Sequence, residues 1–373
     1  MGFPSSFDEF LGNREVVESF RAAIAAGRLP HSLLLTGPRG AGKYTLALLL
    51  TLALECDRQP REVSTDGREL AGFCGECAQC RRILESADLD AKTAEAVEAR
   101  EEMREADKRE TRVLVQTHPD VLVVPPDPPQ MLIKIGQVRT AIARAQTRPA
   151  EARAKVFLFT TSAFMKEAAN SLLKLLEEPP PDVYLMLLAE NASELLPTIR
   201  SRCAVLRLGA LPSEEIVTLL SARGIGHSAR ERELLARLSE GAVGEALRFD
   251  LTAYLAARTE AMVILRGSQG DHSPLFRMTE SYRAGAEGQA KTVALLRAVA
   301  ALLEDILLLQ AGASQRVRNV DLERELSQLA EERSFEWIEA AMRALDQTYA
   351  GMRRNLLRGL SLDALAAVME SAA

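Results

Sequence analysis

The sequence predicts an α/β domain built on a parallel sheet, followed by two helical domains. Short apolar runs alternate with helical stretches up to about residue 209, a pattern typical of a parallel sheet covered on both faces. After about Pro212 the pattern is helical, with glycines between the helices. The length of 373 residues favours two or three domains. We therefore expect an α/β domain over residues 1–209, a small helical domain over 210–265 and a C-terminal helical domain over 266–373.

The elements of the first domain follow from apolar pattern and punctuation. The chain opens with a helical stretch in "NREVVESFRAAIAAGRLP", then a buried strand in "HSLLLTG", a glycine loop and a helix from Lys43 to about Leu54. Further strands are expected in "THPDVLVVPP", "AKVFLF", "DVYLMLLAE" and "CAVLRLGAL". A helix is expected in "IKIGQVRTAIARAQ", and a second in "MKEAANSLLKLLEE", where Pro179 to Pro181 stop it. One face of this second helix carries Ala169, Leu172, Leu173 and Leu176.

Charge and hydropathy narrow the class of protein. A net charge of −6 excludes a generally basic DNA-coating protein but leaves room for a local basic patch. The sequence holds no apolar run as long as a membrane span, and its first residues lack the apolar core of a signal peptide. We expect a soluble cytoplasmic protein with no membrane partner.

A charged segment, residues 88–112, interrupts the α/β pattern. It is almost all charged residues and alanine, with opposite charges three or four residues apart, as in Glu101–Arg104 and Glu105–Arg109. This spacing favours a solvated helical arm inserted into the first domain.

The loop "GPRGAGK" fits the pattern of a phosphate-binding loop. Gly37, Gly40 and Gly42 let backbone amides turn toward phosphate oxygens, and Lys43 would reach the outer phosphates. The next residue should carry a magnesium-binding hydroxyl, but it is Tyr44. Thr45 stands one place further on, where the helix has turned by about 100°. The loop predicts a degenerate nucleotide site, with ATP and magnesium binding left open.

Two threonines stand where phosphate-loop enzymes place acidic residues. Thr160 and Thr161 follow the apolar strand "AKVFLF". A neutral hydroxyl neither balances the charge of a metal ion nor acts as a base at neutral pH. Together with Tyr44, these residues predict that the chain has lost efficient hydrolysis at its own site.

The cysteines predict a structural metal site in a lobe over residues 56–85. Cys74, Cys77 and Cys80 form a C-x-x-C-x-x-C run, and Cys56 is the plausible fourth ligand. Four thiolates satisfy tetrahedral zinc, and clustered cysteines in a reducing compartment bind metal more often than they form disulfides. An iron–sulfur cluster is the alternative from the residues alone. Cys203 is expected to be a buried apolar residue.

An ordered set of motifs gives the chain a family resemblance. "HSLLLTGPRGAGKYTLA", "FCGECAQCRRI", "HPDVLVV", "IKIGQVR", "AANSLLKLLEEPP" and "LLPTIRSRC" occur in order. Together they resemble the AAA+ clamp-loader family of bacterial DNA polymerase III, and within it the delta-prime subunits. The resemblance is strong over about residues 7–212 and weaker through "LSEGAVGEALR" into the C-terminal helices.

The resemblance implies a function in assembly rather than in hydrolysis. Such a loader is a hetero-pentameric ring with gamma/tau and delta subunits that places the sliding β-clamp on primed DNA. The resemblance implies zinc at the cysteines, a lid function for the small helical domain and a ring-forming collar for the C-terminal helices. It further implies that Arg202, in the Ser-Arg-Cys motif, is an arginine finger that acts in trans on the ATP site of a neighbouring gamma/tau subunit.

Two other functions compete with this interpretation. An active gamma/tau-like ATPase would need another metal ligand, such as Thr45 or Asp120. A zinc-dependent nucleic-acid-binding protein would rely on Arg81 and Arg82, but Phe73 is the one aromatic residue near them in the sequence, which is little for base stacking.

Overall fold

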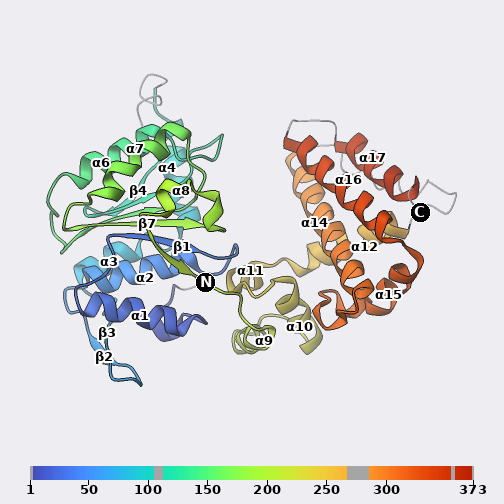
Figure 1. Ribbon diagram of the computed structural model, residues 1–373, viewed down its shortest axis with the longest axis horizontal. Helices are drawn as coiled ribbons and strands as arrows, with labels where there is room; N and C mark the ends of the chain where they lie inside the picture. The colour runs from blue at the N-terminus through green and yellow to red at the C-terminus, as the bar shows by residue number, and fades with distance from the viewer. Residues whose placement is uncertain (1–2, 105–111, 267–284, 354–357, 372–373) are drawn as a thin grey trace. The chain divides into compact units, whose positions relative to one another are not determined.

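The computed structural model describes residues 3–104, 112–266, 285–353 and 358–371 (Figure 1). The described chain divides into two compact units, one of Met1–Leu211 with Ala242–Glu245 and one of Pro212–Gly241 with Ala246–Ala373. Residues 105–111 of the expected charged insert and residues 267–284 of the expected third domain lie outside the described residues. The three-domain division expected from the sequence stays a prediction.

The first unit is built on a central sheet. Among the described residues, six strands pair in the order β4-β5-β6-β7-β1-β8. Their bounds are Val115–His118 for β4, Val121–Val124 for β5, Lys155–Phe159 for β6, Val183–Ala189 for β7, Ser32–Thr36 for β1 and Ala204–Arg207 for β8. All neighbours are parallel except β4, which runs antiparallel to β5. The expected parallel sheet is confirmed, but "THPDVLVV" folds as two strands rather than one.

Helices cover both faces of this sheet, as Figure 1 shows. One layer contains α1 (Arg14–Ala25), α2 (Lys43–Glu55) and α3 (Ala78–Leu84), and the other contains α6 (Ile135–Ala145), α7 (Lys166–Glu177) and the short α8 (Pro197–Arg200). Successive side chains of a strand point to opposite faces. Leu33 and Leu35 of β1 accordingly join the core under the first layer, whereas Leu34 joins the core under the second. Burial on both faces explains why the strands read as continuous apolar runs.

The first unit contains two small insertions outside its central sheet and the helical layers. A hairpin of β2 (Arg61–Val63) and β3 (Glu69–Ala71) lies between Cys56 and the other clustered cysteines, and the sequence pattern did not indicate it. Helix α4 (Leu89–Glu101) forms the described part of the charged insert, and none of its residues is buried. Its Arg100 nevertheless donates to the buried Asp127 at 2.7 Å, so the arm is tied to the domain. Short 3-10 helices span Phe7–Glu9 and Ala192–Glu194.

The second unit is helical throughout its described part. Its elements are α9 (Ser213–Ala222), α10 (Ala229–Leu238), α11 (Val243–Arg248, of which the first three residues belong to the first unit), α12 (Leu251–Arg266), α14 (Gly285–Gln310), α15 (Glu323–Glu332), α16 (Phe335–Arg353) and α17 (Arg358–Ser371), with 3-10 turns at Ser314–Arg316 and Val320–Leu322. Helix α14 packs against α12, α15 and α16 around one apolar core. Trp337 lies in this core and donates its indole N–H to the Met369 carbonyl at 2.8 Å. Among the described residues, no helix combines the length and the apolar character needed to cross a bilayer.

Candidate functional site

The phosphate loop, residues 37–43, connects β1 to α2 at the carboxyl end of the sheet. Gly40 and Gly42 adopt φ values of 76° and 84°, which residues with a side chain rarely adopt. The strand–loop–helix order expected from the sequence is therefore present, and the glycines are used for the backbone turn. Parallel sheets bind ligands at this end, where helix N-termini and loops converge.

The ammonium group of the loop lysine, Lys43, finds hydrogen-bond acceptors within the loop itself. Lys43 Nζ donates to the carbonyl oxygens of Gly37 at 2.7 Å and Pro38 at 2.8 Å. Burial lowers the pKa of this ammonium, while the nearby carboxylates of Glu190 and Glu194 act in the opposite direction. The ammonium is thus held inside the loop by its carbonyls.

Tyr44 points from the loop toward the cysteine-containing lobe. Its hydroxyl donates to the Ser86 carbonyl at 2.6 Å, and Ser86 is almost fully buried. Burial raises the pKa of Tyr44 to about 12. The residue that stands in the place of a metal-binding hydroxyl therefore links α2 to the segment after α3.

The carboxyl ends of β6 and β7 differ in charge. Thr160 continues from β6, with its amide donating to the Val124 carbonyl, and Thr161 Oγ1 accepts from the Ala163 amide at 3.2 Å. Glu190 directly follows β7, and its carbonyl accepts from the amide of Gly37 in the loop at 3.1 Å. The carboxylates of Glu190 and Glu194, which act on Lys43, are therefore beside the loop, but they follow β7 rather than β6, after which an acidic residue was expected. An acidic residue directly after the buried run "DVYLMLLA" is the sequence signal that we missed.

Asp120 lies at the opposite end of the sheet from the loop. It immediately precedes β5, which is parallel to β6 and so starts at the amino end. Its two oxygens accept from the backbone amides of Ala150, Glu151 and Ala152 at 2.7, 2.8 and 2.9 Å. These donors outweigh burial and lower the pKa of Asp120. This carboxylate is therefore part of a structural turn and cannot serve as a metal ligand for the loop.

Arg202 lies on the surface, just after α8. One of its terminal nitrogens donates to the Thr198 carbonyl at 2.8 Å, and the other pairs with Glu177 at the end of α7. The side chain of Arg202 is 33% exposed. Cys203 packs beside the core under α6 and α7, where burial raises its pKa to about 11, but it is half-buried rather than fully buried as expected from the sequence.

Four cysteines meet at the amino end of the sheet. Cys56 follows α2, Cys77 caps α3, and the ligand atoms of Cys56, Cys74, Cys77 and Cys80 all lie within 4.8 Å of one another. Tetrahedral zinc with bonds of about 2.3 Å needs sulfurs about 3.8 Å apart, so a slight contraction accommodates an ion. The cluster can therefore hold a metal ion, and Cys56 is the fourth member expected from the sequence.

Backbone amides point at the sulfurs of this cluster. The amides of Gln59 and Cys74 donate to Cys56 Sγ at 3.3 Å, and the Cys77 amide donates to Cys74 Sγ at 3.3 Å. At Cys74 such donors outweigh burial and lower the pKa to about 7, whereas burial raises the pKa of Cys56 and Cys80. Amide donors stabilise thiolates, which are the form that binds metal.

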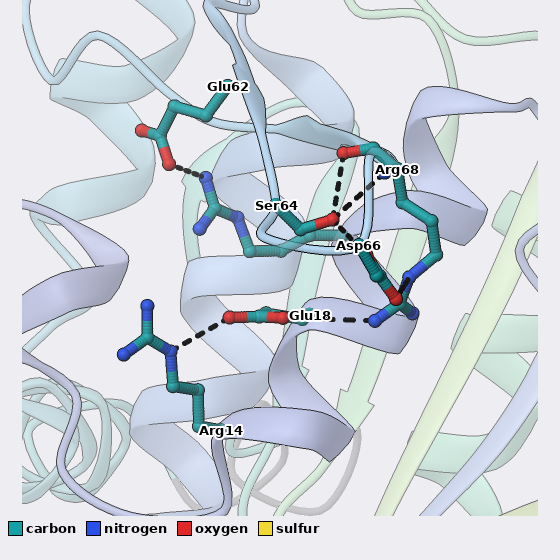
Figure 2. Close-up of polar contacts among 7 residues, drawn as sticks. Arg14, Glu18, Glu62, Ser64, Asp66 and Arg68 are labelled. Atoms are coloured by element: carbon teal, nitrogen blue, oxygen red, sulfur yellow. Dashed lines mark hydrogen bonds and ion pairs between the residues drawn. The ribbon is translucent and has the colours of Figure 1, made fainter.

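The hairpin of the cysteine lobe is fastened to α1, as Figure 2 shows. Arg21 donates to the Ala71 carbonyl at 2.9 Å and pairs with Glu62 at 2.5 Å. Arg68 lies 3.8 Å from Glu18 of the same helix. The hairpin turn is closed by hydrogen bonds among Ser64, Asp66 and Arg68. These contacts hold the segment between Cys56 and Cys74 in place.

Comparison with known proteins identifies the family. A family model described as DNA polymerase III, delta subunit, matches residues 12–212, more than half of the chain. The chain belongs to this family. It is thus a member of the clamp-loader AAA+ family of DNA polymerase III subunits.

Individual relatives carry several subunit names. The Escherichia coli DNA polymerase III subunit tau is 28% identical, over 92% of this chain and 48% of the relative. The delta-prime subunit of Pseudomonas aeruginosa is 33% identical, over 46% of this chain and 41% of the relative. The delta-prime subunit of Escherichia coli is 28% identical, over 84% of this chain and 80% of the relative. The chain thus spans about half or less of the tau subunit and of the Pseudomonas relative. Among solved structures, a gamma subunit-related protein of DNA polymerase III from Thermotoga maritima matches 95% of this chain and 99% of its own, at 18% identity and a TM-score of 0.41.

Proposed function

We propose that this chain is the non-hydrolysing, stator-type subunit of the clamp loader, the role of delta-prime. The observation that carries the proposal is the side chain after the loop lysine. Tyr44 gives its hydroxyl to the Ser86 carbonyl, in the position where phosphate-loop enzymes place a metal ligand. The neutral Thr160 and Thr161 support the same conclusion, because they offer no charge to hold magnesium.

In this proposal Arg202 acts on the ATP site of a neighbouring gamma/tau subunit. A guanidinium stabilises the charge that develops on a transferring phosphoryl group. Arg202 is partly exposed, and its partner Glu177 is 48% exposed. Such a surface ion pair contributes little stability, so a polyphosphate can displace the carboxylate at small cost. Glu177 would keep the guanidinium extended along the surface until the neighbour arrives.

The test is ATP turnover by a loader reconstituted with gamma/tau and delta subunits. Arg202→Ala should lower turnover by about a hundredfold or more, since arginine fingers contribute about 10³–10⁵-fold in related systems. Arg202→Lys should recover a part of the rate, because it keeps the charge but loses the planar fork. Arg200→Ala, at an exposed position two residues earlier, is the matched control. Unchanged turnover with Arg202→Ala refutes the finger.

A second candidate function is that of an active, gamma/tau-like ATPase. The carboxylates of Glu190 and Glu194, which influence the Lys43 pKa, favour it, because they place negative charge beside the loop. Magnesium-dependent turnover by the pure chain, abolished by Lys43→Ala, would establish this function. Absence of turnover at saturating magnesium and ATP would exclude it.

We also propose that the cysteine cluster is a structural zinc site. The zinc ion would be held by Cys56, Cys74, Cys77 and Cys80, and it would cross-link α2 and α3.

We further propose that the chain assembles with gamma/tau and delta subunits into a hetero-pentameric ring, that it contacts the β-clamp and primed DNA through that ring, and that it is located in the cytoplasm. The relatives named tau, gamma and delta-prime support these partners. Co-purification with gamma/tau and delta tests them directly.

A further inference from the structure

A four-residue segment far along the chain packs on the phosphate loop. The amide of Gly244 donates to the Gly40 carbonyl at 2.7 Å, and residues 242–245 belong to the same compact unit as the loop. A Cβ atom on Gly244 would lie 2.9 Å from that carbonyl oxygen and 3.2 Å from Gly40 Cα. The two backbones are thus in direct contact, at a distance that only glycine permits at position 244.

The contact is equally close from the side of the loop. A Cβ atom on Gly40 would lie 2.7 Å from both the amide nitrogen and the Cγ of Glu245, and 3.4 Å from Ala242 Cβ. The carboxylate of Glu245 also lies 3.5 Å from the guanidinium of Arg39, the residue before Gly40. A hydrogen bond, an ion pair and close backbone packing therefore join the segment to the loop.

This segment holds the phosphate loop in a conformation in which the Lys43 side chain bonds to the carbonyls of the loop itself. Nucleotide binding needs Lys43 to leave the Gly37 and Pro38 carbonyls and reach phosphate oxygens. It also brings negative charge close to the Glu245 carboxylate. A loop fixed through Gly40 resists the backbone adjustment, and the carboxylate repels the ligand, so both effects favour the closed loop.

We propose that residues 242–245 form an intramolecular clasp that closes the phosphate loop and competes with nucleotide. This inference rests on the proposed function and extends it, because it explains how nucleotide is kept out of the chain's own site while Arg202 acts on the ATP site of a neighbouring subunit. Competition is reciprocal: what loosens the clasp strengthens nucleotide binding, and nucleotide loosens the clasp by the same factor.

The first test measures binding of ATP to the full chain by calorimetry, with magnesium and with EDTA. Gly244→Ala should bind ATP about tenfold more tightly than the wild type, since it removes contacts of the order of one net hydrogen bond. Glu245→Ala should strengthen binding by about twofold, as expected for an exposed ion pair. Glu214→Ala, an exposed glutamate on α9, is the matched control and should change nothing. Affinity equal to or weaker than wild type in both test variants overturns the clasp.

The second test does not need a folded Gly244 variant. Hydrogen exchange of the wild-type peptide covering residues 242–248 should become faster when ATP is added at several times its dissociation constant. Exchange that is unchanged or slower with bound ATP overturns the competition. These readouts are separate from turnover by the loader, so failure of the clasp and failure of the arginine finger are distinguishable.

Discussion

The two ends of the central sheet use their polar residues differently. At the amino end, buried groups are tied to fixed partners: Glu55 accepts from the amides of Arg153 and Ala154, and His118 lies 2.5 Å from the Gln79 side chain. At the carboxyl end, Lys43 and Arg202 are only partly buried and rest on carbonyls or on a surface carboxylate. The amino end of the sheet thus holds the domain together, whereas the carboxyl end carries charged groups that a ligand or a neighbouring subunit can bind.

The largest effect on stability should come from removing a ligand of the cysteine cluster at the amino end of the sheet. Cys80→Ser should lower the free energy of unfolding by at least about 3 kcal/mol, because structural zinc contributes about 10–16 kcal/mol in small peptides. Urea denaturation and metal analysis by mass spectrometry measure the loss. Cys203→Ser, outside the cluster, should keep the full metal content. A wild-type chain that contains no stoichiometric metal and tolerates Cys80→Ser would contradict the site.

A smaller effect should come from Asp120, which anchors the turn at residues 150–152. Asp120→Asn should cost about 2 kcal/mol at pH 7, since hydrogen bonds to a charged group contribute about 1.5–3 kcal/mol. The folded-state pKa of Asp120 is lowered. Its contribution is therefore fully present above the unfolded-state pKa of about 3.9 and is lost as the pH falls through the folded-state pKa.

Unfolding curves of wild type and Asp120→Asn should thus converge as the solution is acidified below about pH 4. Asp182→Asn, an exposed aspartate before β7, provides the control and should follow the wild type. A gap between wild type and Asp120→Asn that widens toward low pH would show that the amide donors do not stabilise the carboxylate.

The smallest effect on stability should come from Tyr44, which links α2 to the segment after α3. Tyr44→Phe leaves the buried Ser86 carbonyl without this donor, which should cost about 1 kcal/mol. The measurement is again the midpoint of urea denaturation. Tyr184→Phe, in which the ring can keep its stacking on His31, is the control. Equal stability of Tyr44→Phe and wild type would mean that Tyr44 is not a scaffold residue, and the central support for the stator proposal would be lost.

Much of the fold followed from local pattern. Continuous apolar runs predicted β1, β6 and β7, because strands buried on both faces need no polar side. The pattern failed at β4 and at the β2–β3 hairpin. These strands are short and partly exposed, and their apolar alternation is too brief to separate them from loop.

The candidate sites were likewise predicted only in part from the sequence. By itself the sequence determined the glycine frame of the loop, the presence of Lys43 and the three closely spaced cysteines, because spacing along the chain fixes local geometry. Only the tertiary structure decided that Cys56 reaches the cluster, that Tyr44 bonds to Ser86 and that Gly244 meets Gly40. Those contacts join residues 18 to 204 positions apart. Tertiary packing of elements that are distant in the sequence brings such residues together, and no local pattern encodes that packing.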